Sequence, residues 1–144
     1  MITVSQILRE KGASVWSVSP DTKVYEALKL MAEKNIGALL VAEGDRLVGI
    51  FSERDYARKV ILKGKSSKTI PVKEIMTEEV LYIRPSHSIE ECMAVMTSKR
   101  IRHLPVLEQN KILGVISIGD VVKAIISEQE FTIKQLENYI SGGR

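Results

Sequence analysis

The chain has 144 residues, of which 44% are hydrophobic and 27% charged, and its formal net charge at pH 7 is +3. This length suits one ordinary domain or two small ones that share a core. The charge would suit phosphate-bearing small molecules but is too weak to indicate nucleic-acid binding. One cysteine, Cys92, excludes an internal disulfide, and no apolar run approaches the roughly 20 residues that span a bilayer. Charged residues at 9–11 interrupt any signal-peptide pattern. We therefore expect a cytoplasmic protein without membrane contact.

The first half of the chain predicts a helix, two strands and a second helix. Residues 23–34 place apolar side chains at the i, i+3, i+4, i+7 positions of a half-buried helix, which are Val24, Ala27, Leu28 and Met31. Apolar runs at 38–41 and 47–51 flank the tight-turn sequence Glu43-Gly44-Asp45 and predict a hairpin. A second helix is expected over 54–62, followed by a polar linker over 63–71.

The second half repeats the first. Residues 18–62 align without a gap on residues 83–127, and residues 4–8 resemble residues 72–76. Helices are therefore expected over 88–99 and 120–127, with strands over 104–107 and 112–116. A further amphipathic helix over 128–141 would carry Phe131, Ile133, Leu136 and Ile140 toward one side, and residues 142–144 would fray.

One turn occurs in both halves. Gly-Ile-Phe-Ser-Glu-Arg-Asp at 49–55 returns as Gly-Val-Ile-Ser-Ile-Gly-Asp at 114–120. In each copy a strand leads into a polar turn and then a helix, where a hydroxyl, a carboxylate and a helix N-terminus could meet an anionic ligand. An aspartate at a helix start is most often only a cap, so each copy taken alone favours capping.

These patterns predict a mixed α/β (α+β) fold made of two β-α-β-β-α repeats and a C-terminal helix. One repeat of about 50 residues buries too little surface to be stable alone. We therefore expect the repeats, in segments 1–67 and 68–144, to pack about a pseudo-twofold axis with a cleft between them.

In its repeats and turns the chain resembles a CBS-domain pair, or Bateman module, of the stand-alone type. The resemblance covers residues 4–127 and rests on the two turns and on Arg102-His103-Leu104-Pro105-Val106. It implies an adenosine-containing ligand in the cleft and no metal. AMP is the first candidate, NAD or ATP the next, and S-adenosylmethionine a further one.

The resemblance also implies roles for particular residues. Asp55 and Asp120 would accept hydrogen bonds from ribose hydroxyls, with Ser52 and Ser117 near ribose and phosphate. Positions that would hold the adenine ring are Val15, Trp16, Ile36 and Gly37 opposite Asp120, and Val80, Leu81, Ile101 and Arg102 opposite Asp55. Trp16 could instead anchor the core.

The resemblance further implies that the two sites differ in their phosphate contacts. Arg54, with Arg58 one helical turn on, would face phosphate at the Asp55 site. At the Asp120 site Gly119 takes the place of Arg54, and His103 and Arg102 would supply the contacts, although His103 could instead cap its strand.

The sequence contains no catalytic or metal-binding constellation, so an enzyme is not expected. Two functions remain open. The first is an adenine-nucleotide sensor that acts on an unidentified regulated protein, and the second is a structural adaptor that works through its C-terminal helix. The many apolar helix stripes favour a homodimer through helix faces. The basic run at 54–68 reads as a solvated helix face and linker, so nucleic acid is an unfavoured partner.

Overall fold

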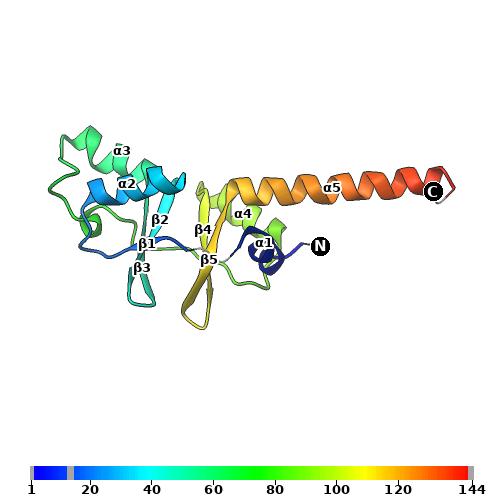
Figure 1. Cartoon of the computed structure of the whole chain (residues 1–144), viewed down its shortest axis with the longest axis horizontal. Coiled ribbons are helices and arrows are strands. Elements are labelled where there is room, and N and C mark those ends of the chain that lie inside the picture. The colour runs from blue at the N-terminus through cyan, green and yellow to red at the C-terminus, as the bar shows by residue number, and fades with distance from the viewer. Residues whose placement is uncertain (1, 13–14, 143–144) are drawn as a thin grey trace. The chain divides into compact units, whose positions relative to one another are not determined.

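The computed structural model describes residues 2–12 and 15–142. Within them the chain forms helices, strands and two short 3-10 helices (Figure 1). In chain order these are α1 (Val4–Lys11), β1 (Ser17–Val18), α2 (Val24–Lys34), β2 (Ala38–Glu43), β3 (Arg46–Ser52), α3 (Glu53–Lys59), η1 (Ile61–Lys63), η2 (Val72–Glu74), α4 (Ile89–Lys99), β4 (His103–Glu108), β5 (Lys111–Ser117) and α5 (Ile118–Ile140). The mixed α/β class predicted from the sequence is confirmed. The first repeat has the order β1-α2-β2-β3-α3, and the second has α4-β4-β5-α5 with an isolated bridge at Ile83 in place of a first strand.

The described residues form two compact units. The amino unit comprises residues 15–82 and 107–113, and the carboxyl unit comprises residues 2–12, 83–106 and 114–142. The segment before the first repeat therefore belongs with the second repeat: the Val4 backbone N–H donates to His87 O at 2.9 Å. Conversely, the segment before the second repeat joins the first, because the Val72 N–H donates to Thr22 O at 2.7 Å.

The amino unit contains a three-stranded sheet in the order β1-β2-β3. β1 runs parallel to β2, and β2 pairs antiparallel with β3 so that Leu40 faces Ile50. The side chains of Leu39, Val41 and Phe51 pack with the apolar stripe of α2 to form the core. β3, and the turn that follows it, are thus anchored to this buried core.

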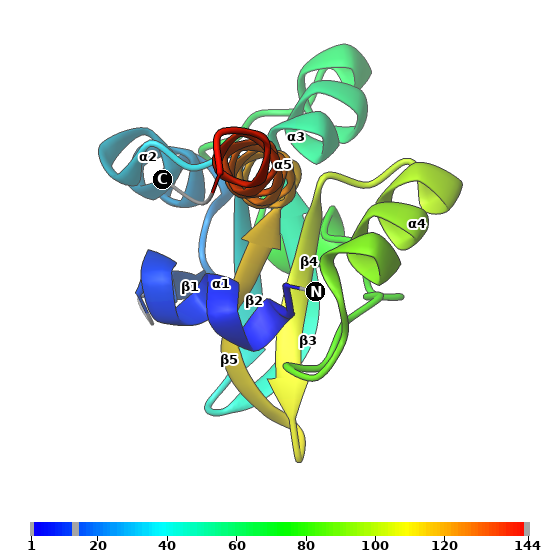
Figure 2. The same ribbon diagram turned by 90° about the vertical axis from the view of Figure 1, so that its right-hand side faces the viewer.

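The carboxyl unit contains the first part of β4 and the last part of β5, and Ile83 adds a parallel bridge to Val106. Its core contains Leu104 from β4, Ile116 from β5 and Val121 from α5, all fully buried. Figure 2 shows α1, α4, β4, β5 and α5. Cys92 on α4 is also fully buried, and burial raises its pKa to about 11, as suits a packing residue. Among the described residues no helix combines the length and apolarity that a membrane span requires.

Several predicted boundaries were wrong. The helix expected over 54–62 is α3, which ends at Lys59, and Ile61–Lys63 form the 3-10 helix η1. The helices expected at 120–127 and 128–141 are one continuous helix, α5, because no glycine or proline interrupts the chain between them. At 3.6 residues per turn this helix puts Phe131 about half a turn from Ile133, Leu136 and Ile140, so Phe131 does not share their side. The predicted fraying at Gly143 and Arg144 lies outside the described residues.

Candidate functional site

The two repeated turns have the same local geometry, one in each unit. Ser52 is the N-cap of α3, and its Oγ accepts a hydrogen bond from Asp55 N at 3.2 Å, while Asp55 Oδ2 accepts from Ser52 N at 3.0 Å. Ser117 and Asp120 repeat this arrangement at the start of α5, at 3.1 and 2.9 Å. A serine followed three residues later by an acid forms such a reciprocal capping box. Both aspartates therefore cap helices, whatever else they do.

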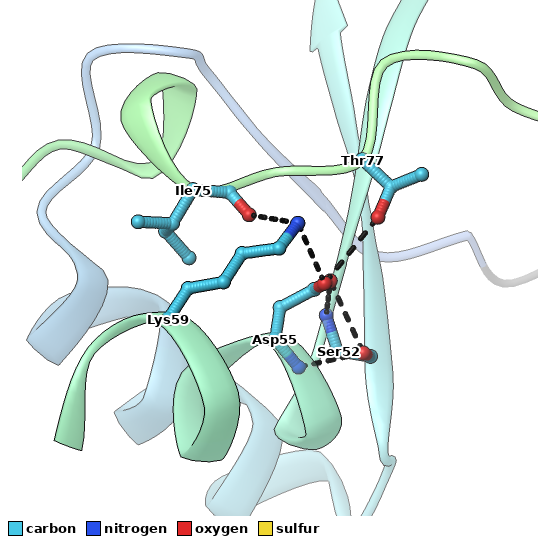
Figure 3. A network of polar contacts seen from close by, with 5 residues as sticks. All are labelled: Ser52, Asp55, Lys59, Ile75 and Thr77. Carbon is cyan, nitrogen blue, oxygen red and sulfur yellow. Dashed lines mark hydrogen bonds and ion pairs between the residues drawn. The ribbon is translucent and has the colours of Figure 1, made fainter. Parts of the chain in front are cut away.

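Asp55 lies at the centre of a polar network in the amino unit (Figure 3). The residue is only 8% exposed, and its Oδ1 accepts from Thr77 Oγ1 at 3.3 Å and lies 3.2 Å from Lys59 Nζ. Lys59 also donates to Ile75 O at 3.1 Å. Sequence reasoning missed both partners of Asp55. The i, i+4 spacing of Asp55 and Lys59 could have indicated the lysine, whereas the Thr77 contact arises only from the tertiary fold.

In the carboxyl unit the lysine comes from a distant segment. Lys11, the last residue of α1, places its Nζ 2.7 Å from Asp120 Oδ2 and donates to Val115 O at 2.7 Å. Burial raises the pKa of Asp120, but the hydrogen bonds from Lys11 and Ser117 outweigh it and lower this pKa overall. Both turn carboxylates are thus paired with a lysine. A carboxylate offers about four lone-pair sites, so ribose hydroxyls could bind beside the lysine or displace it.

In each unit the residue just before the first strand of the hairpin accepts a hydrogen bond from the first residue of the helix that follows the turn. In the amino unit the Glu53 N–H donates to Gly37 O at 3.1 Å, and in the carboxyl unit the Ile118 N–H donates to Arg102 O at 2.9 Å. The structure therefore brings Gly37 to the Ser52–Asp55 turn and Arg102 to the Ser117–Asp120 turn. Each contact lies within a single unit.

The other predicted site residues differ in exposure. Trp16 is 39% exposed, with Lys34 Nζ 4.3 Å from its ring centroid, which disfavours a core-anchor role. The exposed members of the set are Leu81, Arg54, Arg58, Arg102 and Gly119, and the half-buried members are Val15, Ile36, Val80, Ile101 and His103.

Each unit also contains a hollow. In the amino unit a pocket of about 350 Å³ is lined by Ile36 and Gly37, with Glu53 from the turn. In the carboxyl unit a larger one, about 500 Å³, lies between α1 and the start of α5 and includes Lys11, Asp120 and Lys123. Predicted ligand residues therefore line a cavity in both units. Within residues 2–12 and 15–142 no group of three His, Cys, Asp or Glu side chains could hold a metal ion.

The Lys11–Asp120 pair makes a first prediction. Replacing Lys11 with methionine should lower the free energy of unfolding at pH 7 by less than about 1 kcal/mol, since both side chains are partly exposed, at 39% and 22%. The pKa of Asp120 is lowered in the folded state, so its stabilisation is present above the ordinary aspartate pKa and is lost as pH falls through the folded-state pKa. Urea unfolding of both proteins at pH 7 and pH 3 should show the difference shrinking in acid. An equal difference at both values would contradict this pairing.

The two Ser–Asp turns, one on each repeat, define the class of protein. The chain belongs to the CBS-domain family: the family model matches residues 4–62 and again residues 72–127. This confirms the resemblance seen in the sequence. Stand-alone CBS-domain pairs are generally regulatory, non-catalytic modules, and CBS domains in general bind adenosine-containing ligands.

Individual relatives cover most of the chain. The mitochondrial CBS domain-containing protein CBSX3 of Arabidopsis thaliana is 42% identical over 151 residues, which cover 98% of this chain and 73% of that protein. The structure of a protein with CBS domains from Burkholderia ambifaria is similar with a TM-score of 0.85 at 55% identity, over 88% of this chain and 96% of that one. A hexameric CBS-CP12 protein from bloom-forming cyanobacteria gives a TM-score of 0.75 at 30% identity, over 85% and 66%.

Proposed function

We propose that this chain is a regulatory module that binds an adenosine nucleotide through its two Ser–Asp turns. The observation that carries the proposal is the repeated geometry, in which a carboxylate lies at a helix start beside a serine hydroxyl. A carboxylate suits a ribose cis-diol because its two oxygens can accept from two hydroxyl donors. AMP is the first candidate ligand, NAD or ATP the next, and S-adenosylmethionine a further one.

In this proposal Asp55 and Asp120 each hold a ribose, and the phosphate contacts differ between the sites. Arg54 and Arg58 serve the Asp55 site, while His103 and Arg102 serve the Asp120 site. The adenine ring lies against Trp16, Gly37 and their neighbours. Bound ligand favours one conformation of the module over another and so regulates an unidentified cytoplasmic partner. The lysines that hold the carboxylates, Lys11 and Lys59, are the groups such a ligand must share or displace.

The proposal predicts that nucleotide affinity depends on both carboxylates. Asp55→Ala and Asp120→Ala should each weaken AMP binding at the altered site by roughly 10- to 100-fold, because a charge-assisted hydrogen bond contributes about 1.5–3 kcal/mol. Isothermal titration calorimetry of both variants and of the double variant measures this. Asp45→Ala, which removes an exposed carboxylate from the β2-β3 turn, is the matched control and should bind as the parent does.

Both aspartates also cap helices, so a thermal melt must first show that each variant is folded at the titration temperature. Mass spectrometry of small molecules released from the denatured parent protein would identify which nucleotide it carries. If the folded double variant bound AMP, NAD and ATP as tightly as the parent, the aspartates would be caps only and the proposal would be wrong.

A second candidate function is a structural adaptor that works through α5. One observation favours it: Ile133, Leu136 and Ile140 are each more than half exposed on this helix. Retained nucleotide binding with no change in conformation or in partner affinity would favour this adaptor over the sensor.

A further inference from the structure

The Asp55 carboxylate is fully occupied by donors of its own unit (Figure 3). Its Oδ2 accepts from the Ser52 N–H at 3.0 Å and from the Ser52 hydroxyl at 3.1 Å. Its Oδ1 accepts from Thr77 Oγ1 at 3.3 Å and lies 3.2 Å from Lys59 Nζ. A carboxylate offers about four lone-pair sites, so a ribose hydroxyl must displace one of these donors to bind there.

The Asp120 carboxylate is more accessible. Its Oδ2 accepts from the Ser117 N–H at 2.9 Å and from Lys11 Nζ at 2.7 Å, and its side chain is 22% exposed, against 11% for Asp55. Asp120 also lines the carboxyl-unit hollow of about 500 Å³, whereas Asp55 does not line the amino-unit one. A ligand can therefore reach Asp120 from this hollow, and Lys11 is the charged group that already occupies the carboxylate.

A lysine side chain in the carboxyl unit takes the place of a backbone pairing in the amino unit. Ile50 on β3 exchanges two backbone hydrogen bonds with Thr77, at 2.9 and 3.0 Å, and the Thr77 hydroxyl donates to the turn carboxylate. Val115 on β5 is the counterpart of Ile50 in the repeat. There Lys11 Nζ makes both contacts, to Val115 O at 2.7 Å and to the turn carboxylate. The flexible stem of a lysine is easier to move than a paired backbone.

α1 is held differently at its two ends. Its first turn is docked by backbone hydrogen bonds from Val4 and Ser5, at 2.9 and 3.0 Å, and the Val4 side chain is fully buried. Residues 9–11 are exposed, and their side-chain hydrogen bonds to the rest of the unit come from Lys11. Loss of the Lys11 contacts would therefore free the last turn of α1 while the first turn stays docked.

We propose that Lys11 competes with the ribose of a bound nucleotide for the Asp120 carboxylate, and that its displacement frees the last turn of α1. This inference rests on the proposed nucleotide binding and adds to it the element that responds to the ligand. A partly exposed ion pair is weak, so the competition costs the ligand at most about fivefold in affinity. The Asp55 site, whose donors include a residue fixed by backbone pairing, fills at a higher nucleotide concentration.

Adenosine carries no phosphate, so its binding reports competition at the carboxylate without a change in phosphate attraction. Asp55→Ala isolates the Asp120 site, and in this background Lys11→Met should tighten adenosine binding about two- to fivefold, because no ammonium group has to be displaced. Lys134→Met is the matched control, since it removes the same charge about 20 Å further along α5, and it should leave the adenosine Kd unchanged. Isothermal titration calorimetry measures both, after a thermal melt has shown that each variant is folded.

The order of filling is tested with AMP on the two isolated sites. Asp55→Ala protein should bind AMP at least about fivefold more tightly than Asp120→Ala protein, since a ligand at Asp55 has one further hydrogen bond to break. Tighter binding at the Asp55 site would overturn the inference.

Amide hydrogen exchange reports the freed end of α1. Saturating AMP should raise the exchange rates of residues 9–12 and leave residues 4–7 protected, although a ligand ordinarily slows exchange near its site. In Lys11→Met protein, exchange at 9–12 should already be raised and should not respond to AMP. Unchanged or slower exchange at 9–12 in the AMP-saturated parent would overturn the inference.

The measurements also separate this inference from the proposed function. If Lys11→Met protein bound adenosine no more tightly than the Lys134→Met control, Lys11 would not compete for the carboxylate, while AMP binding to the parent would leave the proposed function standing. Weaker AMP binding with unchanged adenosine binding would make Lys11 a phosphate contact and would overturn the inference alone. A parent protein that bound neither AMP, NAD nor ATP would overturn both.

Discussion

Replacing Phe51 with alanine is expected to lower the free energy of unfolding by about 3–5 kcal/mol, because it removes a fully buried aromatic ring and leaves a cavity. Phe51 is at the end of β3 and packs in the amino-unit core with α2 and the segment that contains Val72. Interiors are packed closely, so the neighbours can fill the lost volume only in part.

The chain supplies a matched control, because its only other phenylalanine is exposed. Phe131 on α5 is 66% exposed, and Phe131→Ala should change stability by less than about 0.5 kcal/mol. Urea unfolding followed by circular dichroism compares the two variants. Similar losses for both would show that Phe51 is not the core residue described here.

The effect on the turn distinguishes this residue from an ordinary core position. Phe51 directly precedes Ser52, whose hydroxyl caps α3 and fixes Asp55. A cavity beneath the end of β3 should therefore also loosen the position of the Asp55 carboxylate.

Much of the fold could be predicted from the sequence because the signals are local. The apolar periods placed α2 and α4 within one residue, and Ser88 with Glu91 forms a local capping box at the start of α4. The serine and aspartate of each turn sit together because their spacing of three residues matches one helical turn.

What the sequence could not supply depends on contacts between distant segments. Lys11 reaches Asp120 from 109 residues away, and Thr77 reaches Asp55 from 22 residues away, with no spacing rule to indicate either. The packing of the segment around Val4 with the second repeat, and of the segment around Val72 with the first, also depends on contacts between distant segments. The continuity of α5 was missed for another reason, because an internal repeat suggested a helix end at residue 127 where the chain has no breaker.

The two equivalent glycines of the repeats should differ in their tolerance of a side chain. A Cβ on Gly49 would lie 2.6 Å from Met76 Sδ and 3.1 Å from the Thr77 carbonyl oxygen. A Cβ on Gly114 would meet Leu8 Cδ2 at 2.7 Å, and its next contacts are at 3.7 Å or beyond. The end of a leucine side chain can shift, whereas the Thr77 backbone is held by two hydrogen bonds to Ile50, at 2.9 and 3.0 Å.

Gly49→Ala is therefore expected to cost about 3 kcal/mol, at the upper end of overpacking effects, and Gly114→Ala about 1 kcal/mol. Neither glycine has a positive φ, so steric contact alone causes the difference. The Gly49 variant must displace the Met76 side chain and shift the Thr77 carbonyl by a few tenths of an ångström, which also strains the hydrogen bond from Thr77 Oγ1 to Asp55. Urea unfolding of the two variants side by side measures both losses. If Gly114→Ala were the more damaging, the contact between β3 and the segment at 76–77 would not be the rigid one described, and Asp55 would lack its fixed partner.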